Sequence, residues 1–210
     1  TPIGLIILAE AGLFTGAAFL MGRIGEAQLA GHTLALQIAA LAFQIPFGVA
    51  QAATIRVGLS YGARDHRGIT LAGQASLILG IGFMVVTAAV IWLEPRLVLS
   101  IYVDVDAARN AALVHFALQF LIVAAAFQLF DGAQTVAAGV LRGLQDTRVP
   151  MIIAVCGYWI AGYGTAIYLG FWTPLAGVGV WIGLAVGLIV VSAVLLMRWG
   201  MRARLGLLPA

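Results

Sequence analysis

Long apolar stretches, separated by short polar connections, make up almost the whole chain. Six of these stretches cover residues 3–21, 29–58, 70–92, 111–141, 150–169 and 177–197. Each is long enough, as a helix rising about 1.5 Å per residue, to cross the ~30 Å hydrocarbon layer of a membrane. The pattern therefore predicts an all-α, polytopic membrane protein with six transmembrane helices.

The composition excludes an ordinary soluble domain, in which about a quarter of the residues are charged. Here 63% of the residues are hydrophobic and 9% are charged, and the mean hydropathy is +1.08. The single cysteine, Cys156, lies in an apolar stretch, so there is no disulfide framework and no cysteine spacing typical of a metal site. The chain opens at Thr1 inside an apolar segment without an initiator methionine, so we expect a fragment that lacks an N-terminal portion.

The arginines predict the orientation of the spans. If the N-terminal end is cytoplasmic, the cytoplasmic side carries Arg56, Arg64, Arg67, Arg142, Arg148, Arg198, Arg202 and Arg204. The opposite side carries Arg23, Arg96 and Arg109. This asymmetry fits the rule that cytoplasmic loops are enriched in basic residues, and it predicts that both ends of the chain are cytoplasmic. The basic residues mark topology, so we expect contact with membrane lipid and none with nucleic acid.

Two carboxylates fall deep inside predicted spans, Glu10 in the first and Asp131 in the fourth. An ionised acid at this depth costs roughly 2.5–3.5 kcal/mol, and such residues usually face a cavity or a partner. Helical spacing puts Gln128, Gln134 and Thr135 on the face of Asp131, so we predict that they line a cavity. With no basic residue at similar depth, burial favours a protonated acid or a bound cation. We interpret the pair as ion-coupling or proton-coupling groups; the alternative is a structural role.

A polar stripe follows the second span. Thr33, Gln37, Gln44 and Gln51 recur at intervals of four, seven and seven residues, which places them on one helical face. Such a stripe either forms hydrogen bonds between helices or walls an ion-bearing cavity. The two deep carboxylates favour the cavity, so Gln44 is a candidate lining residue.

Aromatic and histidine residues also suggest roles. Tyr158 and Tyr163 in the fifth span are candidates to line a site for flat cations through cation–π contacts, although packing is the alternative. We expect His32 and His115 to be interfacial residues.

Other features suggest structural roles. We expect Asp104 and Asp106 to cap the fourth span. Arg142, Asp146 and Arg148 should hold the connection that follows it. Spaced glycines in the last span, at 179, 183 and 187, predict close helix packing.

Motifs for hydrolysis or nucleotide binding do not occur in the sequence. The chain contains no HExxH, GxSxG or Walker A pattern. We therefore expect neither an enzyme nor a nucleotide-driven pump.

Three stretches together resemble a known family. They read PIGLIILAEAGLF, AGHTLALQIAALAFQIPFGVAQAATIRVGLSYGARD and FQLFDGAQTVAAGVLRGLQDTRVPMII. The chain is similar to the second half of a multidrug and toxic compound extrusion (MATE) transporter, most of all to the NorM-type branch. The resemblance implies a twelve-helix protein of two six-helix lobes in the bacterial cytoplasmic (inner) membrane. This chain, residues 1–210, would be the C-terminal lobe, and the N-terminal lobe would be absent from it.

The resemblance also implies a function and a set of site residues. Glu10 and Asp131 match the family's cation-binding acids, with a possible Na⁺ between them, and Thr33 and Gln37 match neighbouring polar ligands. Phe127, a further cavity-lining candidate, stands where some relatives place a tyrosine, which reduces the oxygen ligands available to Na⁺. The implied activity is efflux of small organic cations or drugs in exchange for H⁺ or Na⁺, without another cofactor. A flippase for lipid-linked precursors or polysaccharides, or a structural membrane subunit, is the alternative.

Overall fold

The six predicted spans are all helical in the computed structural model, which describes residues 2–209. The elements are α1 (Pro2–Ile24), α2 (Glu26–Gly62), α3 (His66–Leu93), α4 (Pro95–Ser100), the 3₁₀ turn η1 (Ala108–Asn110), α5 (Ala111–Gly143), α6 (Arg148–Cys156), the π-helical segment η2 (Gly157–Tyr163), α7 (Gly164–Phe171) and α8 (Ala176–Gly200). Six helical stretches are long and apolar enough to cross a membrane, with α6, η2 and α7 forming one of them. The predicted all-α, six-span architecture is confirmed.

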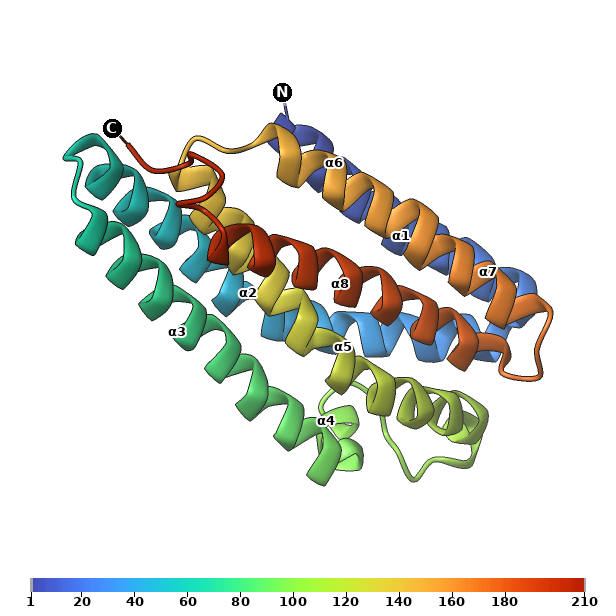
Figure 1. The fold of residues 1–210 in the computed structure, drawn as a ribbon. Helices are drawn as coiled ribbons and strands as arrows, with labels where there is room; N and C mark the ends of the chain where they lie inside the picture. Colours follow the sequence, from blue (N-terminus) through green and yellow to red (C-terminus); the bar gives the residue numbers. More distant parts are fainter. Residues whose placement is uncertain (1, 210) are drawn as a thin grey trace.

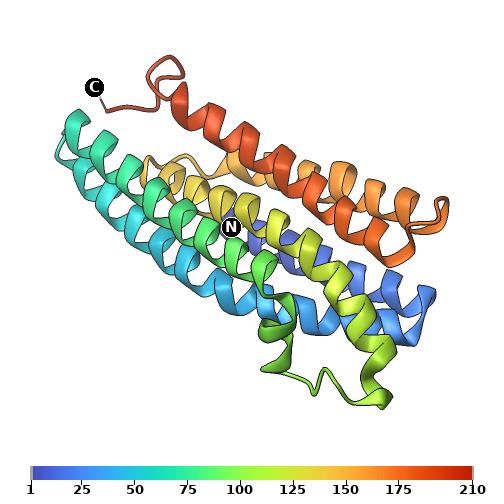
Figure 2. The same ribbon diagram turned by 90° about the horizontal axis from the view of Figure 1, so that it is seen from below.

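Helix α5 lies at the centre of the bundle, where it packs against α2, α3 and α8. Figure 1 places α3 at one edge and α1 with α6 and α7 at the opposite edge. Both chain ends, the α2–α3 turn and the α5–α6 connection lie at one end of the bundle. The view in Figure 2, turned by 90°, again has α2 beside α3 and α8 beside α6 and α7. A face of α5 is thus held between its neighbours over most of its length.

The fifth span is not one regular α-helix. Its middle, Gly157–Tyr163, is π-helical, and α-helix resumes at Gly164. A π-helical turn is rare and often marks a functional site. Here it brings Gly157 and Gly162 against Val191 and Gly187 of α8, and it aims Tyr158 into the bundle.

The predicted glycine ridge of α8 is confirmed as a packing surface. Gly179 lies against the backbone of Leu169, Gly183 against that of Ala166, and Gly187 against Gly162. Inside a membrane, burial of apolar surface gives little drive for helix association, so small residues that let backbones approach are what stabilise such contacts.

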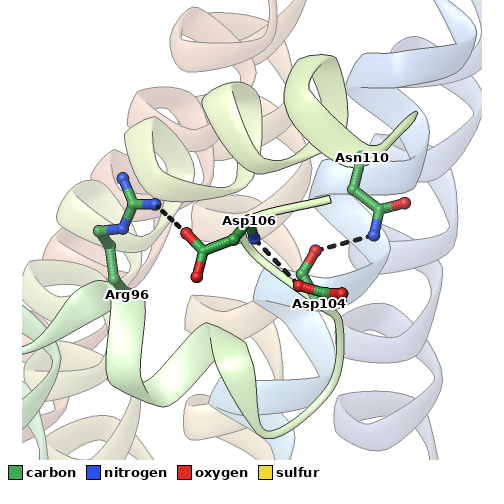
Figure 3. Close-up of polar contacts among 4 residues, drawn as sticks. All are labelled: Arg96, Asp104, Asp106 and Asn110. Carbon is green, nitrogen blue, oxygen red and sulfur yellow. Dashed lines mark hydrogen bonds and ion pairs between the residues drawn. The ribbon is translucent and has the colours of Figure 1, made fainter. Parts of the chain in front are cut away.

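The connection between α4 and α5 is held by its own polar groups (Figure 3). Arg96 binds Asp106 at 3.2 Å. The backbone N–H of Asp106 donates to Asp104 Oδ1 at 3.1 Å, and Asn110 Nδ2 donates to the backbone oxygen of Asp104 at 2.8 Å. The prediction that these two aspartates cap the fourth span is wrong, because η1 separates them from α5, whose N-cap residue, Asn110, makes no capping bond through its side chain.

The α5–α6 connection is fixed at the other end of the bundle. Asp146 accepts a hydrogen bond from Arg198 of α8. Arg202 then bonds Thr70 Oγ1 of α3 at 2.9 Å and stacks over the Trp199 ring at 4.1 Å. The predicted role of Asp146 in holding this connection is confirmed. Arg148 is exposed, and Arg142 lines a cavity described below.

Candidate functional site

The two deep carboxylates lie at one cavity between α1, α2 and α5. This inner cavity has a volume of about 210 Å³ and is lined by Glu10, Phe14, Leu36, Ala39, Ala40, Phe43, Phe127 and Asp131. Glu10 is half-buried, and Asp131 is 4% exposed. The sequence placed these acids in separate spans, and the packing of α1 on the α2–α5 pair brings them to the same space.

Asp131 is held in a short chain of hydrogen bonds. Gln134 Nε2 donates to Asp131 Oδ1 at 3.3 Å and to Thr135 Oγ1 at 3.1 Å. The Tyr158 hydroxyl, from η2, donates to Gln134 Oε1 at 2.6 Å. Because the amide oxygen is occupied by Tyr158, the amide NH₂ has to face the carboxylate. The π-helical segment therefore orients a donor toward Asp131.

A second, larger cavity continues from Glu10 along the same three helices. This outer cavity has a volume of about 470 Å³. Its walls are Ile3, Ile6, Ile7, Glu10, Ala11, Phe14, Phe43, Phe47, Ala50, Gln51, Gln134, Thr135, Ala138 and Arg142. Several of these residues are exposed, Ile7 and Phe47 among them, so the cavity opens at the surface of the described bundle. It has the size and the mainly apolar lining of a small-molecule pocket, with few polar groups.

The polar stripe of α2 lies to one side of the acids. Thr33, Gln37, Gln44 and Gln51 are all exposed. Thr33 Oγ1 bonds the backbone oxygen of Leu29 at 2.9 Å, and Gln44 Nε2 bonds that of Ala40 at 3.3 Å. None of the four lines the inner cavity, and Gln51 alone among them lines the outer one. Their roles as coupling or lining residues stay predictions.

The other candidate residues contact different parts of the bundle. Phe127 lines the inner cavity and packs edge-on against Phe14, with ring centroids 6.0 Å apart. Gln128 turns away from both cavities and donates to Thr87 Oγ1 of α3 at 3.1 Å. Tyr163 packs beside Trp159, with centroids 5.4 Å apart, and covers Gly16 of α1.

Two residues stand where the sequence did not predict them. Arg142, expected in the connection, lines the outer cavity together with Glu10. His32, expected at the membrane interface, is 1% exposed, with its ring 5.5 Å from that of Trp181. The ring is therefore packed inside the bundle against α8, and the interfacial depth of His32 stays a prediction. Helical spacing could have placed Arg142 two turns below Gln134, but nothing in the sequence reports which helix covers His32.

The acidic groups that line the inner cavity are Glu10 and Asp131. Among residues 2–209, no group of three or more His, Cys, Asp or Glu side chains is placed to hold a metal ion. Glu10 and Asp131 supply the carboxylate oxygens, and a hard cation such as Na⁺ would take its other ligands from neutral oxygens or water.

The sequence matches a known family model. The model described as MatE covers residues 2–167. The probable multidrug resistance protein NorM of Mesorhizobium japonicum is 47% identical over 204 residues, which are 97% of this chain and 44% of that protein. The multidrug resistance protein NorM of Burkholderia vietnamiensis is 41% identical over 198 residues, 94% of this chain and 42% of its own length. The chain thus spans less than half the length of these relatives.

Solved structures share the fold. A crystal structure of MATE in the bent conformation superposes with a TM-score of 0.85 at 21% identity, covering 98% of this chain and 44% of that one. A multidrug resistance MATE family transporter of the MOP superfamily, in its outward-facing conformation, gives a TM-score of 0.81 at 22% identity, with 97% and 44% covered. These similarities agree with the resemblance predicted from the sequence.

Proposed function

This chain belongs to the MatE family of multi-pass membrane transporters, and on that premise we propose that it forms half of an exporter of organic cations and drugs. The exporter exchanges its substrate for H⁺ or Na⁺, and Glu10 and Asp131 are the coupling carboxylates. The observation that carries the proposal is that these acids, from two separate spans, line one cavity.

The environment of Asp131 supports this role. Its carboxylate accepts a hydrogen bond from a neutral amide, Gln134, and neither acid forms an ion pair within the described part of the chain. The two acids lie in a space walled by Phe14, Phe43 and Phe127, so their charge has to be neutralised by a positive ligand that enters the cavity. A proton, a Na⁺ ion or the positive group of a substrate can each do so, and they then compete.

Competition produces exchange only if each ligand prefers a different conformation. The coupling cation stabilises one arrangement of the transporter and the substrate stabilises the other. The relatives are more than twice as long as this chain, and in this proposal the additional residues form a second, N-terminal lobe. The exposed stripe of Thr33, Gln37, Gln44 and Gln51 supports it, because amide side chains on an apolar helix need a polar neighbour. Thr33 and Gln37 would then join the site from the lobe interface.

The proposal includes a membrane and an orientation. The bacterial cytoplasmic membrane is part of the proposal, and the bacterial origin of the relatives supports it. The proposed orientation has both ends of this chain, and the Arg142 end of the outer cavity, on the cytoplasmic side, and the arginine asymmetry supports it.

A flippase for phosphate-bearing lipid precursors fits the cavities less well. Such a transporter needs several cationic side chains to meet phosphate. Within the described residues, Arg142 is the one basic side chain that lines the outer cavity, and the inner cavity has none.

Efflux of a cationic dye from cells that lack their main exporters tests the proposal. The complete gene is expressed as wild type, Glu10→Gln and Asp131→Asn at matched membrane levels. Wild type should extrude the dye under an imposed proton or Na⁺ gradient, and the gradient that drives it identifies the ion. Each variant should lose most of the efflux. Variants that extrude dye as fast as wild type would make both acids structural.

A further inference from the structure

Arg202 is held in place by neutral groups. Its Nη2 donates to Thr70 Oγ1 of α3 at 2.9 Å, and its Nη1 donates to the backbone oxygen of Trp199 at 3.0 Å. The Thr70 hydroxyl itself donates to the backbone oxygen of His66 at 3.0 Å, so it offers the guanidinium a lone pair and no negative charge. The guanidinium also stacks over the Trp199 ring at 4.1 Å. These contacts fix the position of the Arg202 charge without neutralising it.

No carboxylate in the described chain forms an ion pair with Arg202. The ion pairs among residues 2–209 join Arg96 to Asp106 and Arg198 to Asp146. Asp146 is therefore already bound by an arginine four residues earlier in the chain. Burial lowers the pKa of the Arg202 guanidinium, because the charged form loses hydration there. An anion that reaches the guanidinium would stabilise its charge.

A second arginine lies on the neighbouring helix. Arg67 is three residues before Thr70 in α3, which places both side chains on one face of that helix. Helical side chains lean toward the N-terminus of their helix, so the Thr70 hydroxyl lies on the Arg67 side. Arg67 is exposed and forms no ion pair within residues 2–209. The nearby Asp65 carboxylate instead caps α3, where it accepts from the backbone N–H of Gly68 at 2.9 Å.

The basic junction, by which we mean Arg67, Thr70, Trp199 and Arg202, lies at the ends of two membrane spans. It is at the end of the bundle that holds the α2–α3 turn and the C-terminal end of the chain (Figure 1). The Trp199 ring packs on Gly73 of α3. Tryptophan and arginine suit the membrane surface, because each has an apolar body and a polar end that reaches the headgroups.

Apolar side chains are exposed on both helices beyond the basic junction, toward the middle of the bundle. They include Leu71, Ile78 and Leu79 of α3 and Ile189, Val190 and Met197 of α8. A ligand bound at the basic junction can therefore have a charged end at the arginines and an apolar remainder against these side chains.

From this arrangement we infer that the basic junction binds the headgroup of an anionic phospholipid, whose acyl chains lie along the exposed apolar side chains of α3 and α8. The lipid phosphate accepts hydrogen bonds from Arg67 and Arg202, on either side of Thr70. Arginine suits this task because its planar fork can bind a phosphate through two parallel hydrogen bonds. Basic sites between transmembrane helices are suited to anionic lipid headgroups in general. Lipid binding here does not depend on the proposed transport activity and requires only that the chain spans a membrane.

Two phospholipids with identical acyl chains test the site. Dioleoyl phosphatidylglycerol carries a net negative charge, whereas dioleoyl phosphatidylcholine is a zwitterion. The complete protein, freed of lipid in detergent, is titrated with each, and native mass spectrometry gives the dissociation constant of the first bound lipid. The variants are Arg67→Gln, Arg202→Gln and Arg202→Lys. Arg148→Gln is the matched control, because it removes an exposed arginine of α6, at the opposite edge of the bundle from α3.

Wild type should bind phosphatidylglycerol at least about tenfold more tightly than phosphatidylcholine, since each arginine near an anionic headgroup contributes about fivefold. Arg67→Gln and Arg202→Gln should each lower this ratio about fivefold and leave the affinity for phosphatidylcholine unchanged. Arg202→Lys should keep part of the ratio, because an ammonium group retains the charge and loses the fork. Arg148→Gln should behave as wild type.

Four results would overturn the inference. Equal affinity of wild type for the two lipids would mean that the protein has no site for an anionic headgroup. An unchanged ratio in both Arg67→Gln and Arg202→Gln would place the preference elsewhere on the protein. Equal weakening of both lipids by Arg202→Gln would leave Arg202 only its role in joining α3 to α8. Displacement of phosphatidylglycerol by millimolar inorganic phosphate would identify a site for soluble anions.

Arg67→Gln keeps the test decisive if Arg202→Gln fails to fold. Arg67 is exposed and makes no ion pair within the described residues, so its replacement should leave the bundle intact. A ratio equal to that of wild type in this variant alone would then exclude the two-arginine site.

Discussion

At the residue scale, the orientation of one amide decides what Asp131 meets. Tyr158 donates to Gln134 Oε1, which turns the amide NH₂ toward the Asp131 carboxylate. Without the phenol, the amide is free to rotate and present its oxygen instead, which would repel the ionised acid. A residue from the fifth span thereby controls the partner of an acid in the fourth.

Tyr158→Phe should weaken this arrangement without leaving a hole, because the ring remains. We expect a loss of about 0.6 kcal/mol in unfolding free energy, the mean for a hydrogen bond between membrane helices, and at most about 1.7 kcal/mol. The measurement is thermal unfolding of the complete protein in detergent. Tyr168→Phe, which alters an exposed tyrosine of the same span, is the control. Equal shifts for the two variants would mean that the Tyr158 bond has no net effect.

Some of the site residues could be predicted from the sequence and others could not. Glu10 and Asp131 were predictable because a carboxylate inside an apolar span is costly and therefore carries a function or a partner. Gln134 and Thr135 followed from helical spacing. Gln128 shares the spacing but turns to Thr87, because α3 offers it an acceptor. The partner of such a side chain depends on which helices are neighbours, and the sequence of a single span does not predict this.

At the element scale, glycine determines how closely the last two spans approach. The Gly187 position on α8 faces the Gly162 backbone in the π-helical segment, and a Cβ placed there would be 2.8 Å from the Gly162 Cα. Backbone cannot move aside as a flexible side chain can. The ridge was predictable from its four-residue spacing, whereas the π-helical segment was not, since its sequence is simply apolar and aromatic.

Gly187→Ala and Gly82→Ala should change the free energy of unfolding in opposite directions. At Gly82, in α3, an added Cβ meets nothing within 4 Å. Alanine should stabilise that exposed helix position by up to about 1 kcal/mol through helix propensity. At Gly187 the added methyl should cost about 1–3 kcal/mol by overpacking. Thermal unfolding of both variants measures the difference, and stabilisation by Gly187→Ala would contradict the packing described here.

At the scale of the whole molecule, the two ion pairs among residues 2–209 lie at opposite ends of the bundle and differ in exposure. The Arg96–Asp106 pair lies in the α4–α5 connection, with its side chains 61% and 85% exposed. The Arg198–Asp146 pair ties the α5–α6 connection to α8, with side chains 18% and 7% exposed. The first faces solvent and the second is largely shielded, so their removal should have unequal costs. The lengths of the spans predicted six crossings, but the pairing of distant charges requires the fold.

Asp146→Asn should destabilise the protein far more than Asp106→Asn. Removing one partner of a shielded pair leaves the other charge unmatched and costs on the order of 3 kcal/mol. Loss of an exposed pair costs below about 1 kcal/mol. Unfolding at low and high salt distinguishes the two, since only the exposed pair is strongly screened. A similar small effect of both substitutions would mean that Arg198 finds another partner.

In the proposed mechanism, a coupling cation and an organic cation compete for Glu10 and Asp131. The most direct measurement is the affinity of the complete, purified protein for a cationic dye as pH and Na⁺ concentration are varied separately. Raising the concentration of the coupling ion should weaken dye binding in wild type, and this dependence should disappear in Glu10→Gln and Asp131→Asn. A dye affinity that is independent of both ions, or a dependence that survives in both variants, would contradict it.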